Sequence, residues 1–331
     1  MTAVKTQLHS ISNDRDRAKA IGAAVELLRK GEVVALPTET VYGLAADALD
    51  PIAVAKIFEA KSRPRFDPLI VHASELMQLE GLVDIPKPDQ DLVIRLAKRF
   101  WPGPFTMVLR RRPLIPEIVT AGLDTVAVRV SAHPVFTEIV RAVGKPLAAP
   151  SANRFGRISP TTAKHVMDEL SGRIPSIIDA GPTTHGIEST IVTVRAGRIQ
   201  VLRRGPTTSE QLSEFGKVEV AETGATISAP GQLPSHYAPK TPLQLVDDLK
   251  SFKPPTRRCG LLAWNPVRKD DRFVAIRNLS EKQDLREAAA NLFRYLRELD
   301  ELGVDLIVAE RVPSQGLGAA ILDRLTRGSH A

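Results

Sequence analysis

The sequence predicts an α/β protein of two domains. Short apolar runs typical of strands alternate with amphipathic segments along most of the 331 residues, as in a sheet covered by helices. The length also suggests two domains, at about 150 residues each. A stretch at 222–242 is rich in proline and glycine and indicates a linker. We therefore expect a first domain over 10–215, a linker at 216–241 and a smaller domain over 242–331.

The first domain begins with a helix over 14–30, where apolar residues recur at helical spacing. Asn13 can cap it, and Gly31 can end it. Pro51 stands at the first position of a second helix, which runs to about residue 62. Further strands are expected at 33–37, 68–72, 104–110, 124–131, 146–151, 176–181, 189–194 and 198–203, and further helices at 89–100, 134–143, 161–170 and 208–215.

The second domain repeats the alternation on a smaller scale. Strands are expected at 259–264, 272–276 and 304–310, and helices at 284–302 and 317–327. This order predicts a small α/β domain.

Composition excludes several classes of protein. Apolar residues make up 43% and charged residues 25%, so the chain can bury a core. The single cysteine, Cys259, excludes an internal disulfide framework and CxxC sites. No run reaches about 18 apolar residues, and the N-terminus lacks the apolar stretch of a secretory signal. We expect a cytoplasmic protein. The net charge of +7 suits either anionic partners, such as nucleotides or RNA, or an ordinary basic surface.

The common nucleotide and metal motifs are missing from the sequence. It contains no GxxxxGK followed by Ser or Thr, no GxGxxG after a strand and no HExxH. Gly316 and Gly318 form half of a glycine motif, which a tight strand-to-helix turn explains. Candidate ligand sites are instead the polar clusters at the ends of expected strands, because ligands of open α/β sheets bind there.

Two clusters combine hydroxyls, carboxylates and cations. The segment 36–44 holds Thr38, Glu39, Thr40 and Tyr42, either as a binding turn or as a helix-capping loop. The segment 61–72 holds Lys61, Arg63, Arg65, Asp67 and His72. Three cations within five residues suit a polyphosphate, because charge-assisted hydrogen bonds are about twice as strong as neutral ones. An ordinary basic loop is the alternative.

Other candidates lie later in the chain. Arg129 stands in an apolar strand and needs an anionic partner, either a structural carboxylate or a substrate carboxylate. The loop 149–165 ends at a helix N-terminus, where backbone N–H groups and hydroxyls can bind an anion. Its candidates, and those of the segments that follow, are Ser151, Asn153, Ser159, Glu188, Ser189, Thr190, Arg203 and Tyr237. Together the clusters suit positioning and charge neutralisation around phosphates, as in phosphoryl or nucleotidyl transfer.

Seven ordered motifs resemble those of the threonylcarbamoyl-AMP synthases. They are LPTETVYGLAADA, KSRP with DPLIVH, WPGPFTMVL, VAVRV, APSAN, GIESTIV and LRRG. The resemblance covers roughly 10–215, the YrdC-like catalytic domain. HYAPKTP and the second domain resemble the longer branch of the family. The resemblance implies a twisted open mixed sheet with a large concave, basic cavity, joined to a smaller Rossmann-like domain.

The resemblance also implies an activity and a set of site residues. The family condenses L-threonine, bicarbonate and ATP to threonylcarbamoyl-AMP, with Mg²⁺ held by the phosphates, and a partner transferase then modifies tRNA beside the anticodon. The residues expected to contact L-threonine are Thr40, His72, Arg129, Ala149 (through its backbone) and Ser189. Those expected to contact ATP are Arg63, Asp67, Thr125, Ser151, Ser159, Arg203 and Tyr237. Lys61 and Arg63 are the expected catalytic residues at the phosphates, and Tyr237 would bring the linker over the nucleotide as a lid.

One residue departs from the family pattern, and two other functions compete. The family usually has Asn where this chain has Asp67, and an ionised Asp near a triphosphate would repel it. An RNA-binding module without chemistry of its own would fit the basic charge, although 5% aromatic residues supply few stacking platforms. A carbamoyl-transfer domain of hydrogenase maturation factors is disfavoured, because the chain lacks an acylphosphatase-like segment and zinc-type cysteines.

Overall fold

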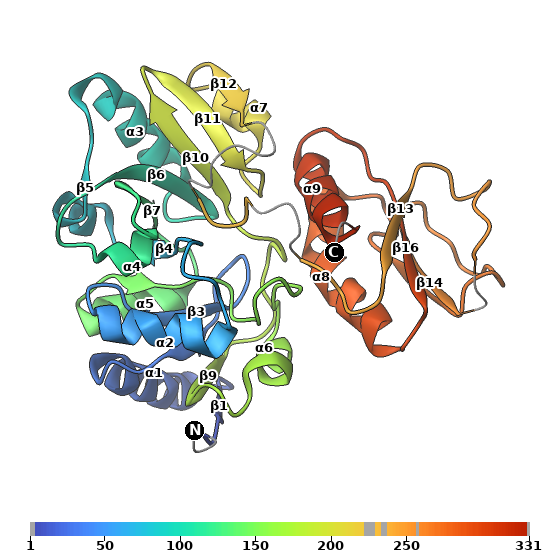
Figure 1. Cartoon of the computed structure of the whole chain (residues 1–331), viewed down its shortest axis with the longest axis horizontal. Helices are drawn as coiled ribbons and strands as arrows, with labels where there is room; N and C mark the ends of the chain where they lie inside the picture. Colours follow the sequence, from blue (N-terminus) through green and yellow to red (C-terminus); the bar gives the residue numbers. More distant parts are fainter. Residues whose placement is uncertain (1–3, 222–228, 233–236, 256–257, 330–331) are drawn as a thin grey trace.

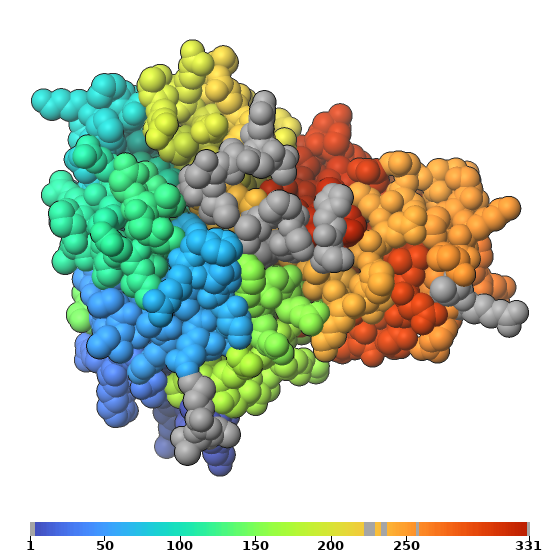
Figure 2. Space-filling model, in the orientation of Figure 1, coloured from blue at the N-terminus to red at the C-terminus, as the bar shows by residue number. Residues whose placement is uncertain are grey.

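The computed structural model describes residues 4–221, 229–232, 237–255 and 258–329. Within these ranges the chain forms a twelve-stranded sheet and a separate four-stranded sheet (Figure 1). Seen as a surface, the first domain, coloured blue to yellow, and the second, coloured orange to red, are in contact (Figure 2). The expected fold class, a mixed α/β sheet with a second, smaller α/β domain, is confirmed.

The large sheet is mixed. Its order is β1-β9-β2-β3-β8-β4-β7-β6-β10-β11-β12, and β5 pairs with β6. The strands are β1 (Gln7–Ser10), β2 (Val34–Leu36), β3 (Gly43–Asp47), β4 (Ile70–His72), β5 (Val83–Asp84), β6 (Phe105–Arg111), β7 (Thr125–Arg129), β8 (Leu147–Ala148), β9 (Ser176–Asp179), β10 (Thr190–Arg195), β11 (Arg198–Arg203) and β12 (Val218–Val220). Strands distant in sequence thus become neighbours, and β4 runs parallel to β7 with His72 opposite Arg129.

The helices that cover this sheet begin within two residues of the expected positions, except the one at Glu117–Thr120, which the sequence analysis does not predict. They are α1 (Asp14–Arg29), α2 (Pro51–Lys61), α3 (Lys87–Phe100), α4 (Glu117–Thr120), α5 (Pro134–Val143), α6 (Ala163–Leu170) and α7 (Ser209–Ser213), with a 3₁₀ turn at Leu76–Gly81. The Asn13 side chain caps α1, and Thr208 forms a capping box with Gln211 at α7. These caps satisfy backbone N–H groups that a helix leaves unpaired.

The small sheet is entirely parallel and has the order β13-β16-β14-β15. Its elements are β13 (Leu243–Val246), β14 (Cys259–Ala263), β15 (Ala275–Asn278), α8 (Leu285–Glu301), β16 (Leu306–Glu310) and α9 (Leu317–Ser329). Figure 1 shows α8 and α9 on the side of this domain that faces the first domain. Their apolar residues share one core cluster with Val41, Ile158 and Ile187 of the first domain.

The structure differs from the expected elements in several places. Strand β3 was missed, because its five residues are all buried and show neither alternation nor β-branched side chains. Strands β1, β5, β12 and β13 are also absent from the predicted set. The strand expected at 146–151 shortens to two residues, and the one expected at 272–276 begins at Ala275. Arg272 instead forms an ion pair with Asp270 in the preceding turn.

Within the described ranges, no helix is both long and apolar enough to cross a bilayer.

Candidate active site

One cavity of the first domain gathers most of the expected site residues. Its wall includes nine of them: Thr40, Arg63, His72, Arg129, Ala149, Ser151, Ser189, Arg203 and Tyr237. Glu188, Pro230 and Gly231 also line it, and its free volume is about 50 Å³. The polar clusters therefore meet because the order of strands brings their ends to one place.

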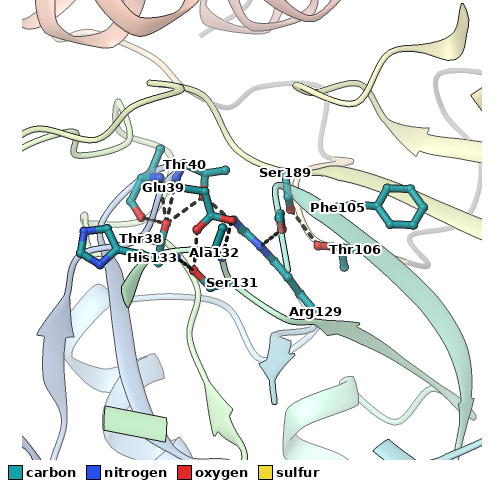
Figure 3. Close-up of polar contacts among 12 residues, drawn as sticks. Thr38, Glu39, Thr40, Phe105, Thr106, Arg129, Ser131, Ala132, His133 and Ser189 are labelled. Carbon is teal, nitrogen blue, oxygen red and sulfur yellow. Dashed lines mark hydrogen bonds and ion pairs between the residues drawn. The ribbon is translucent and has the colours of Figure 1, made fainter. Parts of the chain in front are cut away.

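Arg129 lies at one end of the cavity, at the end of β7. Its Nη2 donates to Glu39 Oε1 at 2.7 Å and its Nη1 to Thr40 Oγ1 at 3.0 Å (Figure 3). Its Nε donates to the Gly103 carbonyl at 3.1 Å. The anionic partner that the sequence left open is thus the structural carboxylate of Glu39. Three contacts in fixed directions leave the planar guanidinium little freedom.

Glu39 connects the residues at the Arg129 end of the cavity by hydrogen bonds. Ser131 Oγ and the backbone N–H of Ala132 donate to its carboxylate, beside Arg129 (Figure 3). Burial alone would raise the pKa of Glu39, but the charge of Arg129 and these hydrogen bonds lower it to about 2. Glu39 was noticed in the sequence but given no role. Its position next to Thr40 was the available signal.

His72 faces the same end from β4. Its ring packs against Phe136, with the ring centroids 5.0 Å apart. Burial, together with the nearby charge of Arg129, lowers the pKa of His72 to about 3. The imidazole is therefore neutral near pH 7, so it can act only as a neutral hydrogen-bonding group.

Arg203, at the end of β11, defines the opposite end. Its Nε donates to the Ser189 carbonyl and its Nη2 to Ser189 Oγ, both at 3.1 Å. Ser189 Oγ also lies 2.8 Å from Thr106 Oγ1. Described residues of the linker complete this end, because Pro230, Gly231 and Tyr237 line the cavity beside Arg203. Ser189 is thus fixed between the strands that carry the two arginines.

Arg63 contributes a third guanidinium. Its Nη2 lies 2.9 Å from Asp67 Oδ2 and donates to the Pro68 carbonyl at 2.9 Å, and its Nε donates to the Asp67 carbonyl. Burial raises the pKa of Asp67, and the charge of Arg63 opposes that rise. Asp67 is buried behind Arg63 and does not line the cavity.

Three other expected residues are also absent from the cavity wall. Lys61 is fully buried, and its ammonium donates to the carbonyls of Ser151 and Asn153. Burial and the charge of Arg63 lower its pKa. The structure therefore places Lys61 behind the 151–153 loop instead of facing the cavity. Ser159 is buried and donates to Glu188, and Thr125 lies at the far end of β7 from Arg129.

A metal ion would find few free ligands in this site. Among the described residues, no group of three or more His, Cys, Asp or Glu side chains is arranged to hold one. The carboxylates nearest the cavity are already paired, Asp67 with Arg63, Glu39 with Arg129 and Glu188 with Arg324. Mg²⁺ takes oxygen ligands and usually keeps several waters, so these residues do not form a dedicated magnesium site.

The fold and the cavity define an α/β protein with three arginines, Arg63, Arg129 and Arg203, on the wall of one cavity. A family model described as "Telomere recombination" matches residues 26–205, and one described as "Threonylcarbamoyl-AMP synthase, C-terminal domain" matches 207–329. Threonylcarbamoyl-AMP synthases of Pyrococcus abyssi and Bacillus subtilis are 38% and 40% identical; the alignments cover 96% and 93% of this chain and 97% and 92% of theirs. The chain therefore belongs to the threonylcarbamoyl-AMP synthase family, and it is a nucleotidyltransferase.

Solved structures of related proteins resemble this chain in fold. The crystal structure of P. abyssi Sua5 complexed with L-threonine matches with a TM-score of 0.87 at 37% identity, covering 98% of this chain and 97% of that one. The Escherichia coli YciO structure matches with a TM-score of 0.50 at 22% identity, covering 62% of this chain and 96% of that one. The second match shows the fold alone.

Proposed function

We propose that this chain condenses L-threonine, bicarbonate and ATP to threonylcarbamoyl-AMP and pyrophosphate. The observation that carries the proposal is one cavity with Arg129 at one end, Arg63 and Arg203 toward the other, and the hydroxyls of Thr40 and Ser189 on its wall. Three guanidinium groups with few free carboxylates suit a site that gathers anionic substrates.

L-Threonine fits the Arg129 end. The relative from P. abyssi was crystallised with L-threonine, and the motif residues Thr40, His72, Arg129 and Ser189 surround this end here. Arg129 supplies a positive charge for the substrate carboxylate, and neutral His72 supplies a hydrogen bond. Hydroxyls that pair with the threonine hydroxyl would disfavour analogues lacking it, because the site's own polar groups would be left unpaired.

The reaction proceeds in two steps. The threonine amine attacks the carbon of bicarbonate, forming the N–C bond of a carbamate and releasing water. A carbamate oxygen then attacks the α-phosphorus of ATP, and the bond to pyrophosphate breaks. A free carbamate is short-lived, so the protein catalyses the reaction mainly by holding the carbamate beside the nucleotide in one cavity.

ATP occupies the end with Arg63 and Arg203, whose charges neutralise the triphosphate. Mg²⁺ comes with the phosphates and supplies further neutralisation there. The free volume of about 50 Å³ is far below the roughly 300–1,000 Å³ of ordinary ligand pockets. Pro230, Gly231 and Tyr237 would therefore have to move aside for the nucleotide, so Tyr237 belongs to the element that closes over it.

The product is handed to a tRNA threonylcarbamoyl transferase in the cytoplasm. A free acyl-adenylate is reactive, so a partner must consume it. Direct contact with tRNA is not required by the cavity. An RNA-binding module remains the second candidate, and only the mild net charge of +7 favours it.

The test is pyrophosphate release from ATP and Mg²⁺, with L-threonine and bicarbonate added separately and together. We expect release only when both are present, with the adenylate identified by mass spectrometry. Serine in place of threonine tests recognition of the β-carbon methyl group, and 2-aminobutyrate, which lacks the hydroxyl, tests the hydroxyl itself. Release with neither substrate, or none at all, would contradict the proposal. RNA affinity that falls steeply with salt and ignores threonine would then favour the RNA-binding module.

A further inference from the structure

The second domain packs directly behind the cavity wall. Gly186 lies so close to α8 that a Cβ there would be 2.5 Å from the Ala289 carbonyl oxygen. Ile158 and Ile187 of the first domain share a core cluster with Phe293 of α8. These residues flank Ser159 and Glu188, so the second domain touches the segments that form the nucleotide end of the cavity.

Arg324 of α9 reaches across this interface. Its side chain is 0% exposed, and its Nε donates to Glu188 Oε2 at 3.0 Å. Its Nη1 donates to Asp323 at 2.8 Å. The pair with Glu188 joins residues 136 positions apart, so this arginine connects α9 to the cavity wall of the first domain.

Glu188 is the residue that this contact controls. It lines the cavity, and its other carboxylate oxygen accepts the Ser159 hydroxyl. Burial alone would raise the pKa of Glu188, but the charges of Arg324 and then Arg203 keep it below the ordinary value. An ionised carboxylate on a phosphate-binding wall would repel the triphosphate and draw Arg203 away from it. Arg324 offsets that charge.

Arg324 also supports the linker. Its guanidinium lies over the ring of Tyr237, 5.0 Å from the centroid, and that ring stacks on Phe293 at 5.7 Å. Tyr237 has a left-handed backbone conformation, with φ of 66°, which packing must stabilise in a residue other than glycine. The second domain thus packs against the linker residue that lines the cavity.

A second arginine strengthens the connection. Arg297 of α8 donates through Nη2 to the Ile158 carbonyl and through Nη1 to Glu169 at 3.2 Å. Ser159, which follows Ile158, is therefore held from two directions by the second domain: Arg297 binds the carbonyl of the preceding Ile158, and Arg324 pairs with Glu188, which accepts the Ser159 hydroxyl.

We infer that Arg324 is a positioning residue for ATP, through which the second domain sets the charge and place of Glu188 and of the Ser159 hydroxyl bound to it. The inference rests on the proposed function, since it assumes that ATP occupies this end. The second domain is then part of the nucleotide site, and it contributes little to L-threonine binding at Arg129, which is held by first-domain residues.

The experiment compares Arg324→Met with the wild-type full chain, in the Glu188 and the Glu188→Gln backgrounds. Affinities for ATP with Mg²⁺ and for L-threonine are measured by calorimetry, alongside pyrophosphate release. In the Glu188 background we expect ATP affinity to fall at least about tenfold, since an unpaired buried carboxylate then faces the phosphates, while threonine affinity changes less than about threefold. In the Glu188→Gln background, Arg324→Met should change ATP affinity by less than about threefold.

Arg277→Met is the matched control, because Arg277 pairs with Glu298 inside the second domain. It should leave both affinities unchanged. Equal loss in both Glu188 backgrounds, or equal loss of ATP and threonine affinity, would show a merely structural role and overturn the inference. If Arg324→Met does not fold, Arg324→Gln replaces it in the same comparison. A wild-type chain that neither binds ATP nor releases pyrophosphate would overturn the proposed function instead.

Discussion

The two ends of the cavity are built in different ways. Among the residues that the structure describes, the polar contacts at the Arg129 end all come from the first domain, and Glu39, Thr40 and Arg129 are buried. At the Arg203 end, the wall depends on the linker through Tyr237 and on the second domain through Arg324. In the proposed reaction, the small substrate L-threonine binds the end built by one domain, and the larger nucleotide binds the end whose wall three segments of the chain share.

Arg129→Met tests the Arg129 end of the cavity and should have the largest effect on ligand affinity and stability. Removing one partner of a buried ion pair leaves Glu39 charged and unpaired, which costs about 3–5 kcal/mol of the free energy of unfolding. L-Threonine affinity should fall at least about 100-fold, and ATP affinity less than about threefold. Calorimetry measures the two affinities, and urea unfolding measures the free energy of unfolding. Arg95→Met, which breaks a surface pair with Asp91, is the control and should change the free energy of unfolding by under about 1 kcal/mol.

Glu39→Gln tests the pair of Glu39 and Arg129 through the pH dependence of the free energy of unfolding. The folded pKa of Glu39, about 2, lies below its ordinary value of 4.5, so ionisation of Glu39 contributes stability above pH 4.5 that is lost as the pH falls toward 2. The shift corresponds to about 3 kcal/mol. The wild type should have a higher free energy of unfolding than Glu39→Gln, and this difference should be largest above pH 4.5 and decrease below it. A difference that is independent of pH would contradict this account.

Gly231→Ala tests the Arg203 end of the cavity, where linker residues form part of the wall. A Cβ on Gly231 would lie 2.9 Å from the Tyr237 hydroxyl and 3.1 Å from Arg203, at a φ of 77°. We expect ATP affinity to fall by about three- to tenfold, since the added methyl group pushes Tyr237 and Arg203 apart. Threonine affinity should stay constant. Gly197→Ala is matched, because it has a φ of 70° with nothing within 4 Å; a similar ATP effect there would refute the steric explanation.

Asp67→Asn should have the smallest effect. The Asp67 carboxylate holds Arg63, which also binds the carbonyls of Asp67 and Pro68. The substitution removes a negative charge near the phosphates but keeps the carbonyl contacts. ATP affinity should be preserved or rise by up to about threefold. A clear increase in the ATP dissociation constant would show that the ion pair positions Arg63 productively. Asp91→Asn on the surface of α3 serves as the control.

The sequence predicted the repeating architecture well, because strands and helices follow local periodicity and caps. Asn13, Pro51 and Thr208 mark helix starts that the structure confirms. Strand β3 escaped because a strand buried on both faces has no alternating pattern. The motifs likewise predicted which clusters meet, and nine expected site residues line one cavity. The ligand roles of those residues remain predictions.

The sequence by itself determined the fold class, the family and the polar clusters, since each depends on residues close together in the chain. The tertiary structure alone decided which charges pair. Glu39 meets Arg129 across 90 positions, and Glu188 meets Arg324 across 136. It also decided that Lys61 binds backbone carbonyls instead of facing the cavity. Such pairs depend on strand order and domain packing, which local periodicity does not encode.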